Sequence, residues 1–269
     1  MGYYIPVERN VNLYVEDIDP GNGKPILFIH GWPLNQEMYE YQFDQLPKLG
    51  YRCIGVGLRG YGKSDRPWTG YSYDRLADDM LAIVDTLGLD DFTLAGFSMG
   101  GAVAIRYMGR HVDHRVSKLA LISAAAPVFT RRPDYPYGMT KEEVNKLIEA
   151  SYQDRPQMLS DFGNLFFARY VTESFKNWFN SLGLVASGHA TIQGLIALRD
   201  EDLRNDLPRI HVPTAIFHGV QDRICPFPFA QAMHAGIRDS IVIPFEKSGH
   251  GLFYCEREKF NRELAHFIG

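Results

Sequence analysis

Short runs of apolar residues recur along the chain and alternate with stretches in which apolar and polar residues follow a helical period. The run PILFI at residues 25–29 is continuously apolar, which is typical of a strand covered on both faces. Similar runs occupy residues 51–56, 91–95, 118–122, 213–217 and 240–245. Each is separated from the next by enough residues for a helical crossover. The pattern therefore predicts a parallel sheet, preceded by an opening hairpin over residues 3–16.

The stretches between these runs include helices with one apolar face. Residues 75–87 carry apolar side chains three or four positions apart, which is helical spacing: Leu76, Met80, Ile83 and Leu87. Asp74 is predicted to be the N-cap of this helix, and Gly88 is predicted to end it. Alternating strands and helices of this kind favour an α/β fold with a mostly parallel, doubly wound sheet.

The alternation stops between residues 127 and 206. The breaker-rich segment RRPDYPYG precedes a helical stretch in which Thr140 and Glu143 match a capping box. Most of the aromatic residues that follow are expected to form the core of this insertion, and a few to line a pocket: Tyr152, Phe162, Phe166, Phe167, Tyr170, Phe175, Trp178 and Phe179. The sequence thus predicts a core domain of residues 1–126 and 207–269, and a helical cap of residues 127–206.

Composition and charge narrow the classes of function. The 269 residues are 45% hydrophobic and 22% charged, as in a globular protein with one large core. The net charge of -4 and the scattered Lys and Arg residues predict no binding to nucleic acid. Three cysteines without paired spacing favour reduced thiols, and no metal or other cofactor is expected.

Targeting signals are not evident in the sequence. The first residues lack a basic segment followed by an apolar one, and no stretch approaches about 18 uncharged apolar residues. We therefore expect a cytoplasmic protein that does not associate with a membrane. Its oligomeric state stays open, and a homo-oligomer is compatible with the sequence.

The hexapeptide GFSMGG at residues 96–101 places one hydroxyl among glycines, between a predicted strand and a predicted helix. In a G-x-S-x-G turn, side chains two residues before and after the serine would collide, and Gly96 and Gly100 have none. The turn lifts the Ser98 hydroxyl clear of the backbone, and the helix that follows directs its positive end at nearby negative charge. Ser98 is therefore predicted to be a nucleophile.

A serine nucleophile needs a base to take its proton and an acid to orient that base. His250, in KSGHGL, lies in a small loop just after the last predicted strand. Asp222 lies four residues beyond the strand that ends at His218, at the same sheet edge. We predict that Asp222 and His250 are the acid and the base. Surface positions are expected for His111, His114, His189, His211, His234 and His266, and for Asp200, Asp202, Asp206 and Asp239.

Acyl transfer also requires hydrogen-bond donors for the oxyanion of the tetrahedral intermediate. The turn supplies the Met99 amide, and the loop after the first core strand, His30-Gly31-Trp32-Pro33, supplies a second amide. Trp32 is the candidate because Pro33 has no N–H. The Trp32 indole is expected either to form a wall of the substrate pocket or to cover the end of the sheet.

These motifs together resemble the α/β-hydrolase fold enzymes over nearly the whole chain. The matching stretches are FIHGWP, GLRGYGKSDRPWTGYSYDRLADDM, LAGFSMGG, FHGVQD and SGHG. More narrowly, the chain resembles the group of aryl esterases, cofactor-free haloperoxidases (perhydrolases) and related lactamases. The resemblance implies a serine hydrolase with Ser98, Asp222 and His250 as catalytic residues. Epoxide hydrolases and haloalkane dehalogenases share the HGWP loop but use an aspartate nucleophile, and the serine at position 98 argues against both.

The expected reaction is hydrolysis of a small, mainly hydrophobic carboxylic ester through an acyl-enzyme. Trp32, Phe97, Ile224 and Leu252 are predicted to bind the substrate because they flank the catalytic residues with apolar side chains. The resemblance also implies a perhydrolase side activity, in which peroxide replaces water. Two alternatives stay open: cleavage of amides, γ-lactams or carbon-carbon bonds by the same residues, and ligand binding without catalysis on the same scaffold.

Overall fold

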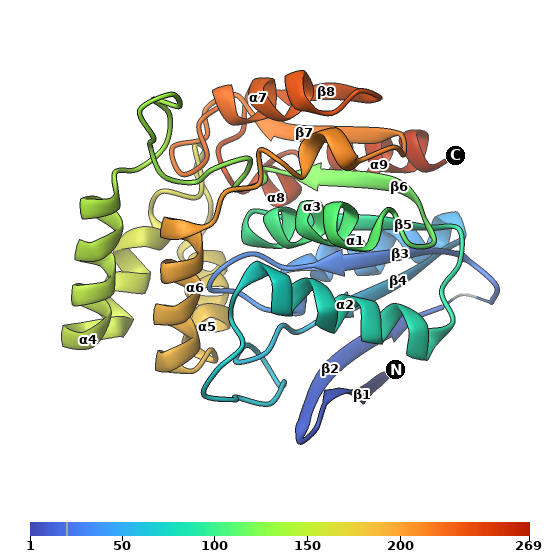
Figure 1. The fold of residues 1–269 in the computed structure, drawn as a ribbon, viewed down its shortest axis with the longest axis horizontal. Helices are drawn as coiled ribbons and strands as arrows, with labels where there is room; N and C mark the ends of the chain where they lie inside the picture. The colour runs from blue at the N-terminus through green and yellow to red at the C-terminus, as the bar shows by residue number, and fades with distance from the viewer. Residues whose placement is uncertain (20) are drawn as a thin grey trace.

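Eight strands form a single sheet in the order β1-β2-β4-β3-β5-β6-β7-β8 (Figure 1). A computed structural model describes residues 1–19 and 21–269. The strands are β1 (Gly2–Glu8), β2 (Val11–Ile18), β3 (Lys24–Ile29), β4 (Tyr51–Val56), β5 (Phe92–Phe97), β6 (Val116–Ile122), β7 (Thr214–Gly219) and β8 (Ser240–Phe245). The pairs β1/β2 and β2/β4 are antiparallel, and the pairs from β4 to β8 are parallel. The predicted hairpin and parallel sheet are therefore confirmed.

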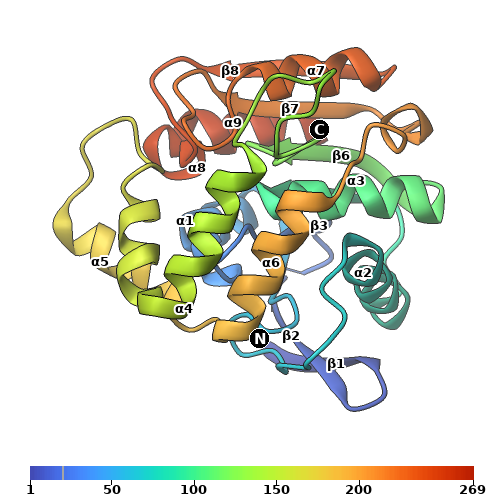
Figure 2. The same ribbon diagram turned by 60° about the vertical axis from the view of Figure 1, so that its left-hand side comes forward.

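Helices cover both faces of the sheet, as the apolar character of the central strands requires. Every residue of β5 is buried, and so is every residue of β7. The helices outside the insertion are α1 (Glu40–Gln45), α2 (Tyr73–Leu87), α3 (Met99–His111), α7 (Pro228–Gly236), α8 (Leu252–Cys255) and α9 (Arg257–Ile268). Helices α2 and α3 pack together on one face, and α1 and α9 lie on the other (Figures 1 and 2). The doubly wound prediction is confirmed.

Helix α2 begins earlier than the sequence pattern predicts. Its N-cap is Ser72, whose hydroxyl accepts a hydrogen bond from the Arg75 amide at 3.3 Å. The prediction of Asp74 as the N-cap is wrong, because the Asp74 carboxylate turns outward and pairs with Arg106 on α3. The predicted end is correct: Gly88 is the C-cap, with a left-handed φ of 57° that glycine adopts without strain.

The insertion between β6 and β7 carries three helices, α4 (Lys141–Gly163), α5 (Glu173–Leu184) and α6 (Gly188–Asp200). They lie beyond the carboxyl ends of the parallel strands (Figures 1 and 2). The predicted capping box of Thr140 and Glu143 is present at the start of α4. Four of the eight aromatic residues are buried, namely Phe162, Phe166, Phe175 and Phe179. Phe167 and Trp178 are partly buried against this core, whereas Tyr152 and Tyr170 are exposed. The boundaries of the cap at residues 127 and 206 stay a prediction.

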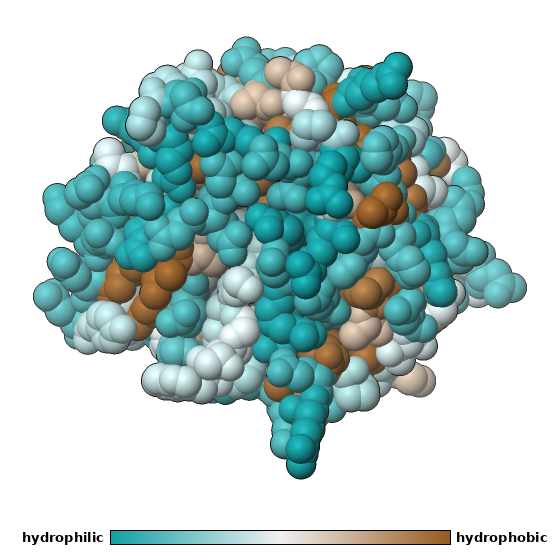
Figure 3. All heavy atoms as spheres, in the orientation of Figure 1, coloured by the Kyte–Doolittle hydropathy of each residue, from teal (hydrophilic) through white to brown (hydrophobic). Residues whose placement is uncertain are grey.

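The surface is largely hydrophilic on the face shown in Figure 3, with apolar atoms in small separate patches, one of them over α4 and α6. Within residues 1–19 and 21–269, no single helix has the length and apolar composition of a membrane span. Helices α5 and α6 meet these criteria only when taken together, with a 91° bend between them.

Asp206 is the exception among the aspartates predicted at the surface. It is 8% exposed, and its carboxylate lies 3.2 Å from Arg106 Nε. Burial raises the pKa of the Asp206 carboxyl. The prediction of a solvated side chain is wrong because Gly109 of α3 allows a close approach: a methyl group at position 109 would lie 2.8 Å from Asp206 Cβ.

Candidate active site

Ser98 lies on the sharp turn between β5 and α3, at the carboxyl edge of the sheet. Its backbone has φ 52° and ψ -118°, in a region that residues with a side chain seldom occupy. Such a conformation costs about 1–3 kcal/mol and persists only when neighbouring structure fixes it. Here the Ser98 amide donates to the Ile122 carbonyl at 2.9 Å, and the Ser98 carbonyl accepts from the Ala125 amide at 3.0 Å. These bonds tie the turn to the end of β6.

The glycines around Ser98 are required by close backbone contacts. A methyl group at Gly96 would lie 2.7 Å from the Gly100 carbonyl carbon, so the two ends of the turn meet each other directly. A methyl group at Gly100 would lie 2.5 Å from the His30 carbonyl oxygen. Both distances are shorter than real contacts of a methyl group, and the neighbouring atoms belong to the backbone and cannot rotate away. The predicted collision within the turn is therefore found at Gly96, whereas Gly100 is required by the backbone at Ile29 and His30.

The loop after β3 passes beside Ser98. A methyl group at Gly31 would lie 2.9 Å from Ser98 Cβ, which places the adjoining Trp32 amide next to the turn. Met99 is the first residue of α3. The first amides of a helix have no hydrogen-bond acceptor within the helix, so the Met99 amide is free to donate to another group. The structure brings the two predicted oxyanion donors to the same edge of the sheet, and their role stays a prediction.

The Trp32 side chain connects the core to the insertion. Its indole N–H donates to the Thr191 carbonyl of α6 at 2.8 Å, and its ring meets the edge of Phe162 from α4, with centroids 5.1 Å apart. Trp32 is 2% exposed. The ring therefore lies between the end of the sheet and the cap helices.

Asp222 is held in the turn that follows β7. Its Oδ1 accepts hydrogen bonds from the Ile224 amide at 2.8 Å and from the Cys225 amide at 2.9 Å. Its Oδ2 lies 2.7 Å from His250 Nδ1. The carboxylate is buried, and a buried charge requires compensation of this kind by hydrogen-bond donors.

His250 follows β8 and is 1% exposed. Its contact with an ionised carboxylate assigns the hydrogen to Nδ1, which leaves the lone pair on Nε2. The ring packs against Phe97, the residue before the serine, and against Phe166, with centroids 4.7 Å and 5.0 Å away. Nε2 makes no hydrogen bond within the described part of the chain, Ser98 included. Bonds of this kind are often long in the absence of substrate and shorten in its presence.

Two further residues lie next to Asp222, and the sequence analysis predicts no role for them. His218 ends β7 and is fully buried, with Nε2 3.7 Å from Asp222 Oδ2. Cys225 is also fully buried, and burial raises the pKa of its thiol well above the usual value, an effect that the neighbouring Ser98 hydroxyl opposes. The only feature of the sequence that indicates their position is spacing. His218 lies four residues before Asp222, and Cys225 lies three residues after it.

The predicted substrate-binding side chains are all apolar and buried. Phe97 and Leu252 are fully buried, Ile224 is nearly so, and Ser98 itself is 5% exposed. Their contact with a substrate stays a prediction. Among the described residues, no group of three or more His, Cys, Asp or Glu side chains has the arrangement of a metal site.

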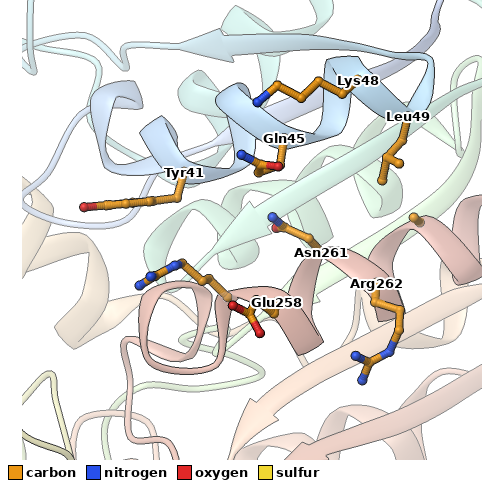
Figure 4. Close-up of a pocket in the computed structure, with 9 residues that line it drawn as sticks. Tyr41, Gln45, Lys48, Leu49, Glu258, Asn261 and Arg262 are labelled. Atoms are coloured by element: carbon orange, nitrogen blue, oxygen red, sulfur yellow. The ribbon is translucent and has the colours of Figure 1, made fainter.

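A separate surface groove lies away from this arrangement. Tyr41 and Gln45 of α1 form one wall, and Glu258 and Arg262 of α9 form the other (Figure 4). The residues that line it include none of the predicted catalytic or substrate-binding residues. This groove is therefore separate from the turn that carries Ser98.

A mostly parallel sheet with a strand-serine-helix turn at its centre, and with an acid and a histidine in the loops after β7 and β8, is the arrangement of an α/β hydrolase. The chain belongs to the alpha/beta hydrolase fold family, whose model matches residues 24–145. It is 56% identical to the AB hydrolase superfamily protein YisY of Bacillus subtilis, over 99% of each chain.

Solved structures agree with this assignment. An esterase (EaEST) from Exiguobacterium antarcticum is 52% identical, with a TM-score of 0.97 over 100% of this chain and 99% of the other. A bromoperoxidase from Bacillus anthracis is 33% identical, with a TM-score of 0.95 over the same shares of the two chains. The predicted family and fold class are thereby confirmed.

Proposed function

We propose that the protein is a serine hydrolase that cleaves small carboxylic esters through an acyl-enzyme. The observation that carries this proposal is the 2.7 Å contact between His250 Nδ1 and Asp222 Oδ2. It fixes the tautomer in which Nε2 is the base, and it places this ring against Phe97, beside the turn that carries Ser98.

In the proposed mechanism, Ser98 Oγ attacks the ester carbonyl while His250 Nε2 takes the hydroxyl proton. Asp222 stabilises the imidazolium that forms, without itself taking the proton. The Trp32 and Met99 amides donate to the oxyanion of the tetrahedral intermediate. His250 then returns the proton to the leaving alkoxide, and a water molecule, activated in the same way, releases the acid.

The proposed substrates are small aryl or alkyl esters. Phe97 precedes the serine in the chain, and Ile224 and Leu252 each follow a predicted catalytic residue by two positions. All three are buried and apolar, and the small exposed fraction of Ser98 favours a short acyl group. We further propose that residues 127–206 act as the cap of this site, because Trp32 contacts α4 and α6 directly. The likeness to both an esterase and a bromoperoxidase supports a perhydrolase side activity, in which hydrogen peroxide replaces water at the acyl-enzyme.

The test compares wild type with Ser98→Ala on a small aryl ester, with and without hydrogen peroxide. We expect the variant to lose turnover except for a residual of about 10³- to 10⁴-fold over the uncatalysed reaction. A variant that keeps wild-type turnover would refute the nucleophile. Parallel assays on a γ-lactam and a β-diketone identify amide or carbon-carbon bond cleavage if either substrate is turned over faster than the ester. Absence of covalent labelling by a fluorophosphonate would instead indicate a ligand-binding protein on the same scaffold.

A further inference from the structure

His218 is a second buried histidine at the acid, and the proposed mechanism does not use it. It lies at the carboxyl end of β7, four residues before Asp222. Its Nε2 is 2.7 Å from the Cys225 carbonyl oxygen and 3.7 Å from Asp222 Oδ2. A carbonyl can only accept, so Nε2 carries the hydrogen and donates it to Cys225. The longer distance to Asp222 is beyond a hydrogen bond.

The His218 ring is therefore neutral and fixed in one tautomer. Its Nδ1 makes no hydrogen bond in the described part of the chain. Burial lowers the pKa of His218, and this effect exceeds the opposing attraction of the Asp222 carboxylate. Among the described residues, the charged or titratable side chains that act on it electrostatically are Asp222 and His250. A neutral ring leaves the negative charge of Asp222 available to His250 alone.

Cys225 connects His218 to both predicted reacting groups. Its carbonyl accepts from His218, its amide donates to Asp222 Oδ1 at 2.9 Å, and its side chain lies beside the Ser98 hydroxyl. The Asp222 amide donates in turn to the Gly219 carbonyl at 3.2 Å. Asp222 therefore lies in a turn between Gly219 and Cys225. The hydrogen bond from the His218 side chain to the Cys225 carbonyl fixes the end of this turn to the end of β7.

We propose that His218 is a positioning residue for the acid: its Nε2–H holds the Cys225 peptide so that the Ile224 and Cys225 amides aim Asp222 Oδ2 at His250. This inference rests on the proposed function. Without the donor, the Cys225 carbonyl is buried and unsatisfied, and the turn relaxes to find another partner. A shift of about 1 Å in a group that orients a catalytic base costs up to about 100-fold in rate.

The test uses three substitutions that differ in where they place a donor. His218→Gln puts an N–H near the position of Nε2, His218→Asn puts one only near Nδ1, and His218→Leu has none. We expect kcat on the aryl ester to fall about 10- to 100-fold for the Asn and Leu variants, with KM changed less than about threefold. The Gln variant should stay within about threefold of wild type in kcat.

Two controls separate positioning from folding. Phe227→Leu removes the ring that meets the edge of His218, at 5.9 Å between centroids, while keeping the donor. It should keep the wild-type kcat. In an Asp222→Asn background, His218→Asn should cause little further loss, because the group it positions is already disabled. If the Leu variant does not fold, the comparison of Gln with Asn decides.

The inference is overturned if folded His218→Asn keeps the wild-type kcat, if the Gln and Asn variants lose activity equally, or if the loss is as large in the Asp222→Asn background as in wild type. Each of these outcomes leaves the proposed function standing as long as Ser98→Ala is inactive. Activity in Ser98→Ala would instead remove the proposed function itself.

Discussion

Replacing Asp222 by asparagine changes one atom and should disable the site without unfolding it. The side-chain oxygen of asparagine can still accept from the Ile224 and Cys225 amides, which lie 2.8 Å and 2.9 Å from Oδ1. Its NH₂ group then faces His250 Nδ1 across the 2.7 Å contact that the carboxylate makes in the wild type. Two donors cannot share that contact, so the hydrogen of the imidazole moves to Nε2.

The expected loss follows from the tautomer. With the hydrogen on Nε2, His250 presents a donor to Ser98 where the reaction needs an acceptor, and no carboxylate stabilises the imidazolium. A wrong tautomer of this kind lowers kcat by about 10⁴-fold. At about 1.4 kcal/mol per factor of ten, the substitution removes about 5 kcal/mol of transition-state stabilisation. KM should change little because Asp222 is buried behind the histidine and does not face the substrate.

The assay is steady-state hydrolysis of the aryl ester, with the melting temperature measured on the same preparations. Asp206→Asn is the matched control, because Asp206 is also a buried aspartate but contacts Arg106 and Gly109, which lie toward the end of α3 opposite Ser98. The control should keep its kcat even if its melting temperature falls. A folded Asp222→Asn enzyme within about tenfold of wild type would refute the assignment of the acid and the tautomer argument built on it.

Two further predictions concern the scaffold of the site. Gly100→Ala places a methyl group 2.5 Å from the His30 carbonyl oxygen, so urea denaturation should show a loss of about 1–3 kcal/mol in unfolding free energy; Gly188→Ala, whose nearest neighbouring atom lies 4.0 Å away, should show no such loss. Burial lowers the pKa of His30 to about 4 from its usual 6.5, so between these pH values only the unfolded chain binds the proton. Stability should therefore fall as the pH drops through this range, by about 3 kcal/mol in total, and a His30→Gln variant should lack this part of the pH dependence.

The strands and the serine turn are predictable from sequence because short-range rules determine them. Continuous apolar runs can be buried only within a covered sheet, and β4 and β8 have the predicted bounds. The glycine at position 96 follows from steric contact over four residues of chain, whereas the one at position 100 also depends on the distant backbone of Ile29 and His30. The acid and the histidine are predictable because both follow parallel strands, whose carboxyl ends meet at one edge.

Features that depend on contacts between distant segments were not predictable. The Asp74 side chain pairs with Arg106, which lies 32 residues further along the chain, and this partner is not evident from the local pattern at the start of α2. The burial of Asp206 depends on the space left by Gly109. The role of the His218 donor depends on the path of the turn back to Cys225, and sequence spacing alone does not specify that path.

The most direct test of the central claim is covalent labelling with a fluorophosphonate, followed by peptide mapping by mass spectrometry. The reagent reacts with an activated serine, so a single adduct is expected on the peptide that contains Ser98, with no adduct in Ser98→Ala and much slower labelling in His250→Ala. Labelling of another residue, or equal labelling of wild type and Ser98→Ala, would contradict the account.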